Sequence, residues 1–295
     1  LLVDRALPSI LGFASVKANL GKLANKGFEL SLNGDIIRTN DFTWTSSGSF
    51  SFNRRKLKSL YGDMEDVLDE NGNVIGQKEK DDPKNGWFIG HDPDQIWDYE
   101  FGGVWQLGQE EEASKYGCKP GDFRFIDQDG NGVLDDDDKT FQGYKTPRFF
   151  WSWRNEFIYK DFSLSFMVYS DIGHYDYYNH ASNSGGMFDR YSTYDQPRWT
   201  PENPTNEYGR IGSYRFANYY KKKTFVRMDN ISLSYAVPKD FLKKFKVQNM
   251  RISLTARNPF TITGWDYFDV EATKKNRDDG LYGMRSYNIS FNFTL

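Results

Sequence analysis

The chain has little cysteine, no long apolar run and no strong excess of charge. Cys118 is its only cysteine, so no disulfide within the chain can hold the fold together. No stretch approaches the roughly 18 consecutive apolar residues of a membrane-spanning helix, so strands would have to make any membrane crossing. The first residue is Leu1, without an initiator methionine or a signal-peptide core, and we expect that processing or truncation produced this N-terminus.

Charge and composition further limit the class of protein to which the chain can belong. Lys and Arg number 38 and Asp and Glu number 41, a net charge of −3, so the chain lacks the basic footprint of a general nucleic-acid binder. Aromatic residues make up 17% of the chain although the mean hydropathy is only −0.74. Much of the hydrophobic character therefore comes from aromatic side chains, which are dispersed along the sequence.

Strict alternation of apolar and polar residues recurs along the chain, whereas helical periodicity is almost absent, and this pattern indicates an all-β protein. In the segment 42–54, for example, Phe42, Trp44, Phe50 and Phe52 share one face. Seven segments alternate in this way: 26–38, 42–54, 147–159, one from Phe162, one from Thr224, one from Asn249 and one that ends at Leu295.

Strand length and loop length favour a membrane barrel over a soluble sandwich. The segments run for about 10 to 13 residues, enough for a tilted strand to cross the roughly 25 Å apolar band of an outer membrane. Rings such as Trp44 and Tyr159 stand near their ends, as interfacial girdles do. Short connections at 39–41, 160–161 and 238–248 alternate with long ones at 55–146, 174–223 and 259–283, which is typical of periplasmic turns and external loops.

The strand count implies a piece of a larger barrel. If the short turns are periplasmic, seven crossings carry the chain from outside to inside, whereas a complete bacterial barrel has an even number of strands. We therefore expect an antiparallel transmembrane β-barrel segment from the C-terminal part of a longer chain. Residues 1–25 would be an extracellular loop segment entering the barrel, and 26–295 would be barrel strands with long external loops.

Two charged residues interrupt the apolar face of one predicted strand. Arg227 and Asp229 share the parity of Ile231 and Leu233, which would place them against lipid. An Arg at mid-bilayer costs roughly 2–4 kcal/mol, so we expect both residues to lie above the membrane or beside a β-bulge. The aromatic stretch from Ile96 to Gln106 predicts structure inside the first long loop.

The ordered set of short motifs resembles the C-terminal third of SusC/RagA-type TonB-dependent outer-membrane transporters of Bacteroidota. Each motif is weak alone, but together they cover nearly all of the chain in the same order. They are Gly21 to Glu29, Tyr99 to Gln106, Pro120-Gly121-Asp122, Gly143 with Pro147, Tyr159 to Ser165, Trp199 to Pro204, Val226 to Tyr235, and Ala256 to Phe260. One departure is Leu295, which stands where outer-membrane barrels usually end on an aromatic residue.

The resemblance implies a nutrient importer in the cell outer membrane, of which this chain is part. It implies an internal plug, a signal that engages TonB in the N-terminal part absent here, and a SusD-like surface lipoprotein that caps the outside. The cargo of such systems is an oligosaccharide or, in some members, a peptide. The resemblance also allows a dimer of transporter–lipoprotein pairs, surrounded by outer-membrane lipid and lipopolysaccharide.

A segment rich in aspartate matches the twelve-residue calcium-loop template. Side-chain oxygens fall at Asp127, Asp129, Asn131 and Asp138, Val133 would offer its backbone carbonyl, and a glycine occupies the sharp turn. Hard cations require such clustered oxygens, so the spacing predicts a structural Ca²⁺ site in an external loop. The alternative is an acidic surface turn.

The loop aromatics are the candidate substrate contacts. Tyr175, Tyr177, Tyr178 and Trp199 offer flat faces and hydroxyls that suit sugar rings. For most of the loop aromatics, however, we expect packing within ordered loops and contact with the lid protein to be the main role. The run from Lys221 to Lys223 suits lipopolysaccharide phosphates or a solvated surface.

No enzyme is expected. The three histidines lack metal-ligand spacing, and no nucleophile or acid–base pair is positioned by a recognisable motif. A soluble calcium-stapled β-sandwich that binds carbohydrate remains the rival to the importer, and a complete small porin is disfavoured by the odd strand count.

Overall fold

The computed structural model describes residues 2–6, 12, 15–19, 21–178, 197–212, 219–266, 269–272 and 283–294. These residues form two compact units. Unit 1 comprises Leu1–Lys26, Arg54–Lys145 and Asp176–Lys221, and unit 2 comprises Gly27–Asn53, Thr146–Tyr175 and Lys222–Leu295. Among the described residues, no helix is long and apolar enough to span a membrane.

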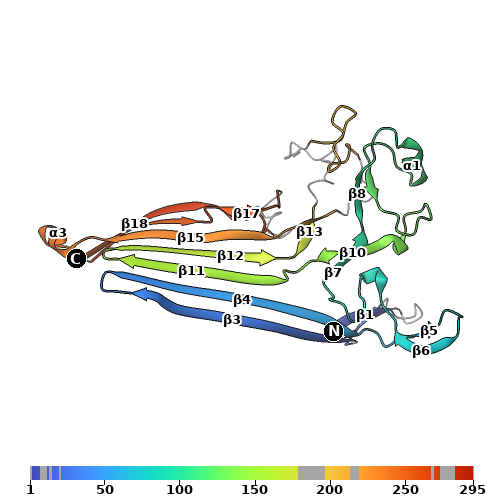
Figure 1. The fold of residues 1–295 in the computed structure, drawn as a ribbon, viewed down its shortest axis with the longest axis horizontal. Coiled ribbons are helices and arrows are strands. Elements are labelled where there is room, and N and C mark those ends of the chain that lie inside the picture. Colours follow the sequence, from blue (N-terminus) through green and yellow to red (C-terminus); the bar gives the residue numbers. More distant parts are fainter. Residues whose placement is uncertain are drawn as a thin grey trace. The chain divides into compact units, whose positions relative to one another are not determined.

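Unit 2 is built on one long sheet whose strands run side by side (Figure 1). The strand order is β18-β16-β15-β12-β11-β4-β3, and β17 pairs with β15 beside this path. The strands are β3 (Lys22–Arg38), β4 (Phe42–Ser59), β11 (Phe149–Tyr159), β12 (Phe162–Ile172), β15 (Phe225–Ala236), β16 (Asn249–Arg257), β17 (Thr261–Thr263) and β18 (Ser286–Thr294).

Each of the seven alternating segments is a strand of this sheet. They have 9 to 18 residues, which meets the length that a tilted transmembrane strand needs. Two strands are longer than expected: β3 begins at Lys22 and β4 continues to Ser59, so they extend into the segments 1–25 and 55–146 that the sequence assigns to loops. The connections stay short where predicted, and that between β15 and β16 contains helix α3 (Lys239–Leu242).

The register gives the sheet one apolar and one polar face, because residues directly opposite each other on paired strands share a face. One row across six strands is apolar: Trp44, Phe157, Leu164, Leu233, Leu254 and Ile289. The row beside it is polar: Thr45, Glu156, Ser165, Ser232, Thr255 and Asn288. Hydroxyl pairs join the strands on the polar face, such as Ser234 with Ser253 at 2.9 Å.

The apolar face is not the inside of a soluble core. Leu32 is 65% exposed, Leu254 53% and Ile289 66%, and no second sheet covers this face among the described residues of unit 2. A soluble sandwich would bury these side chains between two sheets. The rival sandwich prediction is therefore wrong in its architecture.

A few polar atoms do lie on the apolar face, where they bind the indole groups beside them. The Trp44 Nε1–H donates to Asn155 Oδ1 at 2.9 Å, and the Trp153 Nε1–H donates to Ser46 Oγ at 3.0 Å. Asn155 is fully buried although its strand belongs to a single-layer sheet. The rings therefore cover the amide and satisfy their own donors at the same time.

A β-bulge explains the charged residues in β15. The register shifts between Met167 and Val168 of β12, which lie opposite Asn230 and Met228, and Asp229 is the additional residue. The shift reverses the alternation, so that Met228 joins Ile231 on the apolar face. Arg227 pairs with Tyr169 on the polar face. The sequence left two alternatives for these charges, a position above the membrane or one beside a bulge, and the structure shows the bulge.

Unit 1 contains small hairpins, and aromatic residues of β7, β8 and β9 pack against one another within it. Its paired strands are β1 (Leu2–Ala6) with β2 (Ser15–Asn19), β5 (Met64–Leu68) with β6 (Val74–Glu79), β7 (Gln95–Tyr99) with β10 (Lys139–Tyr144), and β8 (Phe101–Val104) with β9 (Phe123–Phe125). β13 (Tyr175–Tyr177) pairs with β14 (Tyr220–Lys222), and each of these two strands has residues assigned to both units. Helix α1 spans Glu110–Lys115. Ile96, Val104, Trp105 and Phe123 are buried, so the stretch from Ile96 to Gln106 is structured as expected.

Substitutions on adjacent residues of β18 test the assignment of the faces. In the whole protein folded into lipid vesicles, we expect Ile289→Arg to lower the free energy of unfolding by about 2–4 kcal/mol, because the charge would enter hydrocarbon. Ser290→Arg, on the neighbouring exposed and polar position, should cost much less. Urea titration of both variants measures the difference, and equal costs would show that the two faces meet the same medium.

Candidate functional site

The aspartate-rich loop lies between β9 and β10 of unit 1 and is shaped by its own side chains. Asp127 accepts hydrogen bonds from the backbone N–H groups of Gly130 at 2.7 Å and Gly132 at 2.8 Å. Both glycines have positive φ values, 72° and 82°, which other residues rarely adopt. Asn131 Oδ1 accepts from the Val133 N–H at 2.7 Å, which tightens the same turn.

Three carboxylates of this loop converge. One oxygen each from Asp127, Asp129 and Asp138 lies within 4.8 Å of the others. Asp138 is fully buried and accepts from the backbone N–H groups of Gln128 at 2.7 Å and Asp135 at 2.9 Å. The Asn131 amide lies beside the cluster, since its Nδ2 donates to Asp129 Oδ2 at 2.9 Å. The Val133 side chain is exposed.

Hydrogen bonding favours the charged form of the first carboxylate. Burial raises the pKa of Asp127, but hydrogen bonds from the Gly132 N–H, the Tyr116 hydroxyl and the Gly130 N–H outweigh it and hold the pKa below its usual value. Tyr116 donates to Asp127 at 2.9 Å, and burial together with this carboxylate raises the pKa of the phenol. The loop thus presents an ionised oxygen donor near neutral pH.

The remaining aspartates of the loop are used elsewhere. Asp136 pairs with Lys139 at 2.6 Å, and this hydrogen bond holds the pKa of Asp136 below its usual value. Asp135 caps a short 3-10 turn by accepting from the Asp137 N–H at 3.0 Å. The structure therefore separates three converging carboxylates from the two, Asp135 and Asp136, that shape or neutralise the turn, and the converging set is chemically suited to a hard cation.

Two of the four candidate substrate aromatics are buried. Tyr178 is fully buried, packs edge-on against Tyr219 and lies under the Lys221 ammonium, which is 4.5 Å from its ring centre. Trp199 is 7% exposed and donates from Nε1 to Gln106 Oε1 at 2.8 Å. In this structure both residues pack within unit 1.

The other two candidates lie nearer the surface. Tyr175 and Tyr177 are half-buried on β13, and the Tyr177 ring packs edge-on against Tyr220 at 6.1 Å between ring centres. Substrate contact by Tyr175 and Tyr177 stays a prediction.

Several other charged residues have internal partners. Lys221 pairs with Glu207 at 3.0 Å, and Lys223 is 7% exposed with its ammonium 5.2 Å above the Trp265 ring, so the three-lysine run is not a simple cationic surface. Arg55 forms ion pairs with Asp92 and Asp94. These neutralised carboxylates fit a structural role.

Sequence reasoning missed partners that lie far away in the chain. The Tyr220 hydroxyl donates to Asp98 Oδ2 at 2.8 Å, and Asn206 Oδ1 accepts from the Val104 N–H at 2.8 Å. These contacts join residues about a hundred positions apart, and no local spacing could have indicated them.

No family model matches the chain. Among curated proteins, the chain is 31% identical to TonB-dependent receptor P3 of Formosa agariphila over 283 residues, covering 94% of this chain and 28% of that protein. It is 29% identical to TonB-dependent receptor P26 of the same organism, covering 100% of this chain and 31% of that protein. It is 28% identical to TonB-dependent receptor SusC of Bacteroides thetaiotaomicron, covering 88% of this chain and 25% of that protein. The chain thus spans about a third or less of the length of these relatives.

Solved structures share the fold. The structure of the RagAB peptide transporter aligns with a TM-score of 0.69 at 22% identity, covering 99% of this chain and 32% of that one. The RagAB peptide importer in its 'closed-closed' state aligns with a TM-score of 0.63 at 24% identity, covering 92% of this chain and 29% of that one. This likeness confirms the predicted fold class, an all-β barrel segment.

Proposed function

The chain belongs to the SusC/RagA type of TonB-dependent transporters, and from this premise we propose that it forms part of the wall of an outer-membrane nutrient importer. It is not an enzyme, since its relatives are receptors and transporters. The chain would contribute seven crossings of the barrel, with the polar face toward the passage and the apolar face toward lipid. Energy would come from TonB, through a part of the protein not included in this sequence.

The observation that carries the proposal is a long single-layer sheet in a chain that is similar to TonB-dependent receptors along nearly its whole length. Leu233, Leu254 and Ile289 are about half exposed or more on one face, which a protein in water would have to cover. On the other face, Ser232 and Thr255 hydroxyls meet at 2.9 Å, as the wall of an aqueous passage allows.

The same similarity to transporters supports a proposal for the partner and the cargo. We expect a SusD-like surface lipoprotein over the outer end, and an oligosaccharide or a peptide as cargo. A solved structure with the same fold is described as a peptide transporter, which supports the peptide alternative. The oligosaccharide alternative and the lipoprotein rest on the sequence resemblance. Tyr175 and Tyr177 are the candidate contacts to cargo or partner, because they are less buried than Tyr178 and Trp199.

A bound calcium ion is the second part of the proposal. The carboxylates of Asp127, Asp129 and Asp138 would be ligands together with the Asn131 amide oxygen and the Val133 carbonyl. Their convergence within 4.8 Å supports this, since three carboxylates so close repel one another without a counter-ion. The ion would fasten the loop between β9 and β10 and take no part in transport.

Location and partnership can be tested on the native protein. We expect it in the outer-membrane fraction, soluble only with detergent and with a gel mobility that heating changes, as intact barrels show. A tagged copy should co-purify with a surface lipoprotein, and loss of the gene should abolish growth on one class of glycan or peptide. A monodisperse protein in the soluble fraction would contradict the proposal.

Calcium binding is tested by hydrogen exchange of the whole protein in detergent. After chelation, adding Ca²⁺ alone should slow exchange at the Gly130 and Gly132 amides. Asp129→Asn should weaken the apparent affinity by about tenfold or more, because affinity follows ligand charge. Asp137→Asn is the matched control, since that carboxylate is exposed and outside the cluster. Identical affinities for the two variants, or no effect of Ca²⁺, would refute the site.

A further inference from the structure

Two cations of unit 2 are nearly buried at one end of β15. Arg227 is 4% exposed and Lys223 is 7% exposed. A buried charge is costly unless it is paired and hydrogen-bonded, so the partners of these two residues reveal what the fold must hold in place there.

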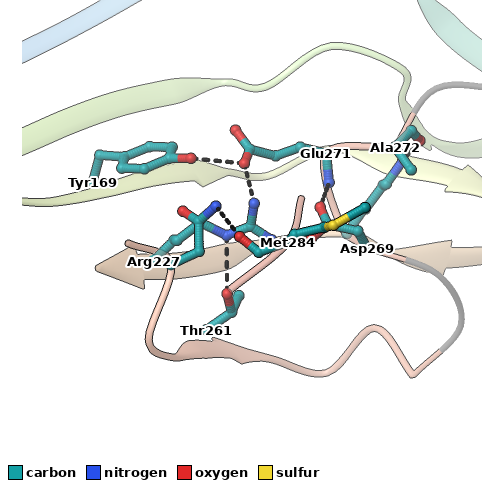
Figure 2. A network of polar contacts seen from close by, with 9 residues as sticks. Tyr169, Arg227, Thr261, Asp269, Glu271, Ala272 and Met284 are labelled. Carbon is teal, nitrogen blue, oxygen red and sulfur yellow. Dashed lines mark hydrogen bonds and ion pairs between the residues drawn. The ribbon is translucent and has the colours of Figure 1, made fainter. Parts of the chain in front are cut away.

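Arg227 binds the segment that follows β17 (Figure 2). Its Nη2 lies 2.8 Å from Asp269 Oδ2, and its Nη1 donates to the Glu271 carboxylate. Its Nε donates to Thr261 Oγ1 at 2.9 Å. The Tyr169 hydroxyl of β12 donates to the same Glu271 carboxylate at 2.7 Å, so that two strands of the wall hold one acidic side chain.

A second attachment lies beside the first. The Lys223 ammonium is 5.2 Å above the Trp265 ring and 3.4 Å from the Ala272 carbonyl oxygen. Trp265 and Val270 are 7% and 5% exposed, so apolar packing accompanies the charges. The fit is close at Gly283 as well, where an added Cβ would lie 2.8 Å from Asp269 Oδ2. We name the described residues Trp265, Asp266 and Asp269–Ala272 the ledge.

The bulge determines the face on which the ledge lies. Because Asp229 reverses the alternation of β15, Arg227 lies opposite Tyr169 and Thr261 on the polar face. Ile262, between the two inward threonines of β17, points to the apolar face and is 65% exposed. Without the bulge, Arg227 would point to the apolar face and could not reach the ledge. The ledge therefore covers the polar face at the end of the sheet where Asp171 of β12 lies opposite Phe225 of β15.

We propose that the ledge is an inward-folded constriction which limits the size of cargo that enters the passage, and that Arg227 is the residue that positions it. This rests on the proposed function, because only in a barrel is the polar face the side of the passage. Arg227 suits the task, since a planar guanidinium can hold two carboxylates and a hydroxyl at once. Removing it leaves Asp269 and Glu271 close together and near Asp171, which shares the polar face with Tyr169.

The test uses Arg227→Met in the full-length transporter. The first measurement is hydrogen exchange at the Glu271 and Ala272 amides, which donate within the ledge to Asp269. We expect exchange at least about tenfold faster in Arg227→Met, because the segment loses the contacts that keep it from opening locally. Lys243→Met is the matched control, since the Lys243–Asp240 ion pair is on the surface at the other end of β15.

The second measurement tests the passage itself. In a Cys118→Ser background, Ser165→Cys places a thiol on the polar face, and intact cells are treated with maleimide-polyethylene glycols of graded mass. Arg227→Met should admit larger reagents than the unmodified ledge does. Arg227→Lys should restore part of the size limit, because it keeps the charge but not the fork of donors.

The outcomes separate the inference from the proposed function. Unchanged exchange in Arg227→Met, or faster exchange with an unchanged size limit, would overturn the constriction. Glu271→Gln, a milder change, keeps the test valid if Arg227→Met does not assemble, and it should shift both measurements in the same direction. Absence of the protein from the outer membrane would refute the proposed function instead, while the exchange measurement would still report on the ledge.

Discussion

Contact between the apolar face of the sheet and hydrocarbon is the interaction on which the rest of the structure depends. A single-layer sheet satisfies its backbone hydrogen bonds within the layer but leaves both faces open. The polar face of unit 2 can be hydrated, whereas the row that includes Leu233 and Ile289 cannot be without a large cost. The length of the strands and the alternation along them follow from that requirement.

The same requirement explains the exceptions. Where polar side chains lie on the apolar face, as at Asn155 and Ser46, a tryptophan N–H donates to the oxygen of each one. Where a charge cannot be tolerated, as at Arg227, one additional residue in β15 turns the side chain to the other face. The bulge therefore keeps the charge of Arg227 off the apolar face. It also allows the buried guanidinium to reach the loop after β17.

The sequence predicted whatever depends on local periodicity. The seven strands, the short turns, the bulge near Asp229 and the converging aspartates could all be predicted, because alternation and ligand spacing are properties of neighbouring residues. The burial of Tyr178, the partners of Trp199 and the contact of Tyr169 with Glu271 could not. Those contacts join residues brought together by the fold of long loops, and nothing in their local composition distinguishes a packed ring from one that meets a ligand.

Spin labels in the whole protein, folded into lipid vesicles, measure most directly what the apolar face touches. Labels at Leu32, Phe52 and Phe291 are compared with labels at the adjacent polar positions Asn33, Ser51 and Asn292. The account predicts that oxygen dissolved in the bilayer relaxes the first set strongly, while a water-soluble nickel chelate reaches it weakly and reaches the second set better. Labels of the first set that are shielded from both reagents, and so packed against protein, would contradict it.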